Sequence, residues 1–202
     1  MLIKLILFCI TSYALVAHPV IWSGGRVFNV ISTKKLTEVK FHHTISRQMA
    51  VGGHVLEFTN GPTVAMVQFN RLIRRWNADA SQGNLYGFLG FGSTIAGKES
   101  GVVHLGAQAD WETRRVYTYL GYDGFFMRES RQVVKARVGV APYLANYLAI
   151  QPWVLLQVSS IIDGDGHHLT VLPVLRLYKG NVLIELGSNF RDNALVTAMI
   201  HF

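Results

Sequence analysis

Residues 101–112 read GVVHLGAQADWE, and apolar and polar positions alternate along them. Successive side chains of an extended strand point to opposite sides, so Val103, Leu105 and Trp111 share one face. His104 and Asp110 fall on the other face together with the small residue at 106. The stretch therefore predicts a β-strand with one apolar face and one polar face.

The same alternation recurs along the chain beyond residue 17, in about twelve pieces separated by turn residues such as Asn60-Gly61-Pro62 and Lys179-Gly180. We predict strands at 26–33, 36–46, 49–59, 62–77, 82–97, 101–112, 114–127, 130–146, 147–162, 167–178, 181–190 and 194–202. With no helical periodicity between these pieces, we expect an all-β domain built from one antiparallel sheet.

The composition separates a membrane barrel from a soluble sandwich. Half of the 202 residues are hydrophobic and only 15% are charged, with a formal net charge of +7. This excludes a disordered chain and a coiled coil, and it leaves too few charges to cover the outer faces of a soluble sandwich. Alternate apolar and polar faces instead suit a transmembrane β-barrel, with a lipid-facing exterior and a polar lumen.

The first seventeen residues are expected to be a signal peptide. A basic start at Lys4 precedes an apolar stretch, and Ala17 is a small residue that suits a cleavage site. Cleavage there would remove Cys9, which is the one cysteine of the chain. We therefore predict a signal peptide at 1–17 and a barrel at 18–202, with no run of 18 apolar residues that would form a transmembrane helix.

The last nine residues, ALVTAMIHF at 194–202, alternate and end on Phe202. They resemble the terminal strand of bacterial outer-membrane β-barrels, whose last aromatic residue is recognised by the barrel-assembly machinery. The resemblance implies an outer-membrane location, with outer-membrane lipid and that machinery as partners. It also implies an even number of strands with both termini in the periplasm, so twelve strands are expected, with ten or eight as alternatives.

A second resemblance rests on short motifs, namely His18-Pro19 with Gly24-Gly25, Asn70-Arg71-Leu72 with Trp76-Asn77, residues 109–112 and residues 135–139. These are similar to uncharacterised small outer-membrane proteins that are often encoded near heavy-metal transport genes. The resemblance implies a function connected with metals, without pointing to a particular mechanism.

Aromatic and basic residues near strand ends suggest the two membrane interfaces. The pairs Trp76 and Tyr86, Trp111 and Tyr117, and Tyr143 and Trp153 are expected to form aromatic girdles. The basic pairs Arg74-Arg75 and Arg114-Arg115 are expected to meet lipid phosphates. Nucleic acid is not an expected partner, because the basic residues are scattered and the chain is exported.

Charged residues on the predicted inward faces are the first candidates for function. Lys135, Arg137, Arg176 and Glu185 would either pair with one another or form a constriction that selects anions. His104 and Asp110 share a face, but they are roughly 20 Å apart on one strand, so a His–Asp pair would need a neighbouring strand.

We expect no cofactor, and copper at either of two histidine positions is the alternative. Cleavage after Ala17 would give His18 a free amine beside its imidazole, a set of nitrogens that copper binds well. His167 and His168 follow the turn Asp163-Gly164-Asp165-Gly166. The simpler alternatives are a flexible leader before the first strand and an ordinary Gly-Asp turn.

The function that these patterns favour is a small pore or a structural envelope protein, and not an enzyme. The alternatives are a copper-related envelope protein and a lipid-modifying enzyme. The enzyme would use a histidine with a serine such as Ser46 or Ser188, although no local motif marks such a site. The patterns leave the solute, the openness of the lumen and the oligomeric state undetermined.

Overall fold

The computed structural model describes residues 18–98, 100–146, 148–164 and 166–202, so the predicted signal peptide lies outside the described residues. The described part contains twelve strands: β1 (Arg26–Thr33), β2 (Leu36–Ser46), β3 (Met49–Phe58), β4 (Thr63–Ala78), β5 (Ser81–Ala96), β6 (Gly101–Thr113), β7 (Val116–Phe126), β8 (Arg131–Val140), β9 (Gln151–Asp163), β10 (Gly166–Lys179), β11 (Val182–Ser188) and β12 (Ala194–His201). Among these residues, no helix has the length and apolar character needed to cross a membrane.

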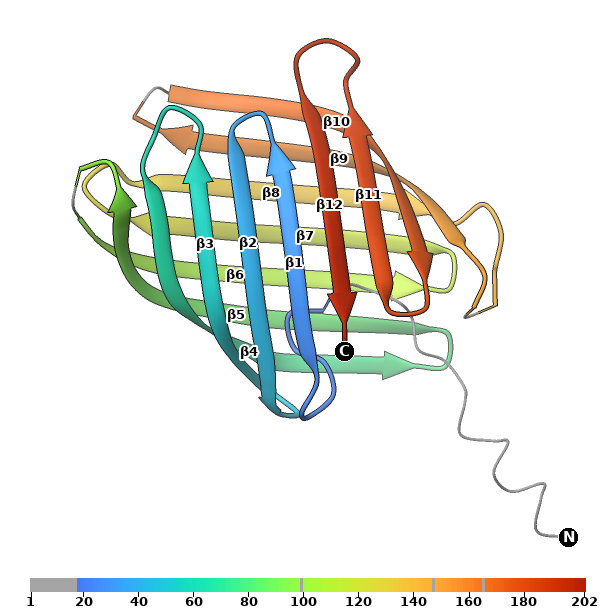
Figure 1. Cartoon of the computed structure of the whole chain (residues 1–202). Coiled ribbons are helices and arrows are strands. Elements are labelled where there is room, and N and C mark those ends of the chain that lie inside the picture. Colours follow the sequence, from blue (N-terminus) through green and yellow to red (C-terminus); the bar gives the residue numbers. More distant parts are fainter. Residues whose placement is uncertain (1–17, 99, 147, 165) are drawn as a thin grey trace, which may run out of the picture.

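The sheet closes on itself, as Figure 1 shows. Each strand pairs antiparallel with its neighbours in sequence, and β1 pairs with β12 from Val27↔His201 to Thr33↔Leu195. Beyond this ladder, the Arg26 amide donates to the Phe202 carbonyl at 2.6 Å, and the Phe202 amide donates back at 2.9 Å. Closure leaves no free sheet edge. The prediction of an all-β, twelve-stranded antiparallel barrel is confirmed, and the alternatives of ten and eight strands are wrong.

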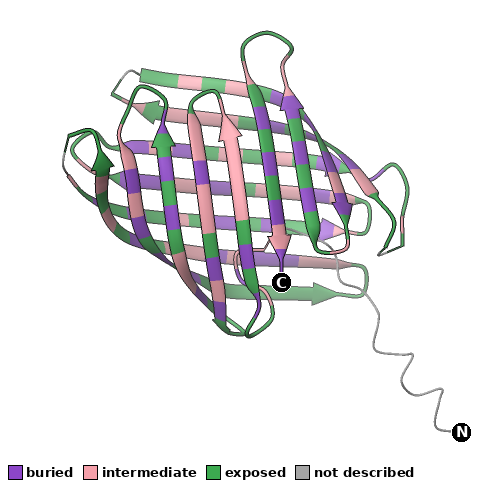
Figure 2. Cartoon of the chain, in the orientation of Figure 1, coloured by how far each residue is buried: buried purple, intermediate pink, exposed green. Residues whose placement is uncertain are grey.

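Burial follows the alternation along almost every strand, so buried and exposed positions form bands in Figure 2. Inward positions carry polar, charged and aromatic side chains as well as apolar ones. Outward positions are apolar yet exposed, which is the arrangement that a lipid-facing exterior requires. Examples of these exposed outward residues are Val67, Phe91, Leu105, Leu120, Val138, Val154, Ile184, Leu186 and Val196.

The predicted strand at 130–146 was wrong at its end. β8 stops at Val140 and β9 begins at Gln151, so these two strands are separated by more residues than any other successive pair. Pro142 has no backbone N–H for the ladder, which accounts for the stop. The side chain of Gln151 then holds the loop by accepting from the Ala145 amide and donating to the Tyr143 carbonyl, both at 2.6 Å. This connection lies at the end that carries the termini.

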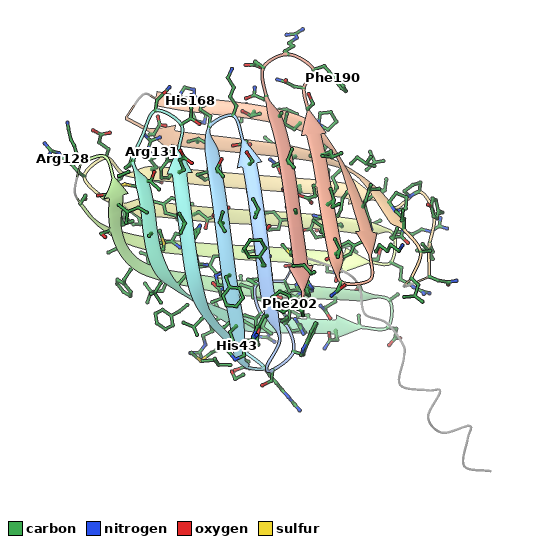
Figure 3. All side chains as sticks on the ribbon, in the orientation of Figure 1. His43, Arg128, Arg131, His168, Phe190 and Phe202 are labelled. Carbon is green, nitrogen blue, oxygen red and sulfur yellow. The ribbon has the colours of Figure 1, made fainter. Side chains whose placement is uncertain are left out.

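The two ends of the barrel can be followed in Figure 3. His43 and Phe202 lie at the end that carries the termini, and Arg128, Arg131, His168 and Phe190 lie at the opposite end. We call these the terminal end and the distal end.

The expected aromatic girdle was wrong for half of its members. Trp76, Trp111 and Tyr143 are exposed near the terminal end, and Arg74 lies over the Trp76 ring at 5.3 Å. Their expected partners are buried inside the barrel, namely Tyr86, Tyr117 and Trp153. Arg75 also differs from the expected lipid contact, because its Nε donates to Asn84 Oδ1 at 2.6 Å. The predicted girdle was based only on how near each residue lies to a strand end. Alternate residues of a strand face opposite sides of the sheet, and this alternation places Tyr86, Tyr117 and Trp153 inside.

The outward face provides a test of the barrel in lipid. Ala107 is exposed at the middle of β6. We expect Ala107→Arg to lower the free energy of unfolding in phospholipid vesicles by about 2–4 kcal/mol, because the charge would lie near the bilayer midplane. Urea unfolding followed by tryptophan fluorescence measures the change. Ala107→Leu is the matched control for bulk, and equal stability of the two variants would contradict a lipid-facing β6.

Candidate functional site: a charged lumen with one end occupied

A first cluster joins three of the predicted lumen residues. Glu185 on β11 accepts a hydrogen bond from Arg176 Nε at 2.7 Å, and Arg137 Nη1 donates to both of its carboxylate oxygens at 3.1 and 3.2 Å. Arg137 Nε also donates to Gln157 Oε1 at 2.7 Å. The Arg176 guanidinium lies 4.5 Å from the centre of the Tyr117 ring. One carboxylate is therefore shared by two guanidinium groups, and the cluster keeps one net positive charge.

A second cluster contains residues that the sequence pattern did not single out. Glu38 on β2 contacts both Lys40 Nζ and His54 Nε2 at 2.7 Å. His104 Nε2 lies 2.8 Å from Asp123 Oδ1 on β7, and the His54 and His104 rings are 5.8 Å apart. The His–Asp contact of His104 is thus made with a neighbouring strand, β7, and not along β6. The alternation of Glu38 and Lys40 was a visible signal, but their partners depend on the pairing of strands.

Asp110 and Lys135 have different surroundings. Asp110 accepts hydrogen bonds from Asn84 Nδ2 at 2.6 Å and from Gln108 Nε2 at 3.1 Å, and it is not paired with His104. Lys135 points inward from β8 and makes no hydrogen bond or ion pair with another described residue. Within the described lumen, Lys135 is therefore a cation whose ammonium group is not engaged by a direct partner.

These clusters surround a cavity with an empty volume of about 870 Å³, part of which is open to solvent. The charged side chains that line it are four cations and three carboxylates, namely Lys40, Lys135, Arg137, Arg176, Glu38, Asp123 and Glu185. The four residues predicted from the sequence, Lys135, Arg137, Arg176 and Glu185, carry a net charge of +2. Adding Lys40, Glu38 and Asp123 lowers the net charge of the cavity wall to +1.

The segment before β1 lines the same cavity. His18 and Pro19 contribute to the cavity wall, although they precede the sheet. The His18 side chain is 11% exposed, with Nδ1 at 2.9 Å from the Tyr86 hydroxyl and Nε2 at 3.9 Å from Glu112 Oε1. Burial first, and then the electrostatic effects of Arg75 and His201, lower the pKa of His18 to about 3. The imidazole is therefore neutral at neutral pH. Because His18 is nearly buried and contacts Tyr86 inside the barrel, the alternative of a flexible leader is wrong.

The described residues do not surround either histidine position with a metal-binding set. No group of three or more His, Cys, Asp and Glu side chains in the described chain is arranged to hold a metal. His167 and His168 are consecutive on β10 and face opposite sides, so they do not converge on one ion. His167 Nε2 lies 2.6 Å from Ser160 Oγ, and His168 Nε2 lies 3.9 Å from Asp163 Oδ1. Copper binding at His18 stays a prediction that this geometry does not support.

Neither of the two candidate serines of a lipid-modifying enzyme has its hydroxyl bonded to a histidine among the described residues. Ser46 ends β2 at the terminal end, and Ser188 ends β11 at the distal end, where its hydroxyl accepts from the Phe190 amide. The exposed contact between Ser160 and His167 has no carboxylate bonded to the imidazole among the described residues. None of these positions assembles a nucleophile, a base and an orienting acid.

Comparison with known proteins supports the fold and leaves the family open. No protein-family model matches the chain, and no curated protein matches it. Among solved structures, a KdgM porin in complex with disordered oligogalacturonate is similar at a TM-score of 0.56, with 8% identity over 88% of this chain and 98% of that chain. A second KdgM porin structure gives a TM-score of 0.50, with 11% identity over 88% of this chain and 99% of that chain. At these identities the likeness shows a porin-like barrel fold, while the recognition of Phe202 and the metal-linked resemblance stay predictions.

The shared carboxylate provides a stability test. We expect Glu185→Gln to lower the free energy of unfolding by about 3–5 kcal/mol, because it leaves two buried guanidinium groups without their counter-charge. Denaturant unfolding in detergent or lipid measures the loss. Glu57→Gln is the matched control, since Glu57 is exposed on β3. If both variants lose the same small amount, the cluster does not stabilise the barrel.

Proposed function

We propose that the protein is a pore of the bacterial outer membrane that passes small anionic solutes. The observation that carries this proposal is the cavity inside the barrel, into which Lys135 projects without a direct partner. A charge in a narrow, poorly screened lumen attracts solutes of opposite sign more strongly than it would in water. The closed barrel and its apolar exterior support a location in a membrane, with lipid as the surrounding partner.

The pairing pattern identifies which cation faces a passing solute. Arg137 and Arg176 are both engaged by Glu185, and Lys40 is engaged by Glu38. These groups hold the inner walls together. Each of these cations is bonded to a carboxylate, and one net positive charge is left on the cluster of Arg137, Arg176 and Glu185. Lys135 lies on the same strand as Arg137, two residues away, and therefore adds an uncompensated charge beside the cluster. One of the similar porins is recorded with oligogalacturonate, an anion, but that ligand belongs to that protein.

Lys135 gives the experiment that tests the proposal. Intact protein in planar bilayers under a salt gradient is expected to show small conductance steps with a preference for anions. In Lys135→Gln, the ratio of anion to cation permeability should fall roughly twofold or more, because the uncompensated charge is removed. The reversal potential measures this ratio.

Lys179→Gln is the matched control, since Lys179 is exposed at the end of β10 and is absent from the cavity wall. An unchanged reversal potential in Lys135→Gln would contradict the role of this lysine. If no form of the protein conducts, the pore is excluded and a structural barrel remains.

A further inference from the structure

We propose that residues 18–25 form a peptide plug that binds inside the lumen and closes the terminal end of the barrel. The site that receives the plug is a peptide-binding surface on the inner wall. It therefore accepts the same sequence, HPVIWSGG, when that sequence is supplied as a separate peptide. The consequence for conductance rests on the proposed pore function, whereas the binding of the peptide does not.

Backbone hydrogen bonds hold the plug against the inner wall. The buried Asn70 on β4 donates from Nδ2 to the Pro19 carbonyl at 3.3 Å. The buried Thr44 on β2 accepts from the Ile21 amide at its hydroxyl, and its carbonyl accepts from the Gly24 amide at 2.8 Å. The Thr44 amide donates in turn to the Gly25 carbonyl at 2.9 Å. Thr44 therefore makes three hydrogen bonds to the backbone of the segment, as a sheet strand does to an added peptide.

Two apolar side chains of the plug point to different parts of the wall. Val20 is 1% exposed and packs with Ala50, Leu72 and Tyr86. Ile21 packs against a separate cluster from the strands on either side of the β1–β12 seam, namely Val27, Tyr178, Leu183 and Met199. Consecutive residues thus bridge inner surfaces that come from opposite parts of the sheet. A segment that touches both of them obstructs the space between.

The tip of the plug meets polar groups that have few other partners. The Tyr86 hydroxyl contacts His18 Nδ1 at 2.9 Å. Glu112 is 1% exposed, and its Oε1, 3.9 Å from His18 Nε2, has no hydrogen-bond donor among the described residues. A buried carboxylate oxygen without a donor is costly. Glu112 is therefore an unsatisfied group in the wall, directed at the residue that the plug brings to it.

The plug can leave without breaking the sheet. It precedes β1 and contributes no strand to the barrel, so its withdrawal leaves the twelve ladders intact. Gly24 has a φ of +85°, in the left-handed region that glycine adopts without steric cost. At this residue the chain turns from the lumen into β1. Because His18 and Pro19 form part of the cavity wall, withdrawal would join the cavity that Lys135 lines to the terminal end.

Removal of the plug is the first test. A variant that lacks residues 18–25 is expected to conduct at least severalfold more than intact protein in planar bilayers. Synthetic HPVIWSGG added at the terminal end should return the conductance to the intact level. A peptide of the same composition in scrambled order is the control and should leave the conductance unchanged.

A single hydroxyl provides a second test in case the truncated chain folds poorly. Tyr86→Phe removes the contact to His18 at 2.9 Å and a longer one from Arg75 Nη2 at 3.4 Å, and it keeps the ring that packs on Val20. Loss of one such hydrogen bond should raise the fraction of time spent open by about twofold to tenfold. Tyr143→Phe is the matched control, because the exposed Tyr143 hydroxyl donates to the Ile150 carbonyl and makes no contact with the plug.

Binding of a fluorescently labelled peptide separates the plug from the pore. Anisotropy should show that HPVIWSGG binds the truncated barrel and does not bind intact protein, whose own segment fills the site. If the peptide binds in this way but no form conducts, the plug stands and the pore function is excluded. If the truncated barrel conducts like intact protein and binds no peptide, the plug is overturned while the pore stands.

Discussion

The backbone pairing of β1 with β12 is the interaction on which the rest of the structure depends. Once the first and last strands share a ladder, each strand has two neighbours and the sheet encloses a space. Every second side chain must then enter that space, and the others must face outward. The lumen charges, their pairing and the position of the plug follow from this closure.

The closed barrel restricts the charge of the side chains that point inward more than it restricts their size. A carboxylate or guanidinium that points inward loses much of its water, so it needs a partner across the strands. Glu185 is bonded to Arg137 and Arg176 at 2.7–3.2 Å. Glu38 is in contact with Lys40 and His54, both at 2.7 Å. The walls are thereby stabilised by compensated groups. A solute in the cavity meets mainly the exception, Lys135.

Period-two alternation was sufficient to predict the architecture. The bounds of β2 agree with the predicted 36–46, and the bounds of β1 agree with 26–33. The error at β8 came from treating Pro142 as a strand residue, although proline removes a ladder donor. The aromatic girdle failed for Tyr86, Tyr117 and Trp153 because parity was not applied.

The candidate site was predicted only as a set of inward residues. Nothing in a single strand shows that Lys40 lies opposite His54, because cross-strand register is set by turns and by the whole closed sheet. The insertion of His18 into the lumen could not be predicted from the sequence for the same reason. The residues that receive the segment, Thr44, Asn70 and Tyr86, lie on three different strands. No spacing along the sequence brings them together.

The seam also has a consequence for how much of the chain the barrel needs. The segment that carries the plug joins directly to β1, and the free side of β1 is covered only by β12, at the other end of the sequence. Without β12 the wall has a lateral gap beside the plug, and Ile21 lacks contacts that include Met199. A chain that lacks residues 194–202 would therefore lose the closed wall and part of the surface that holds the plug.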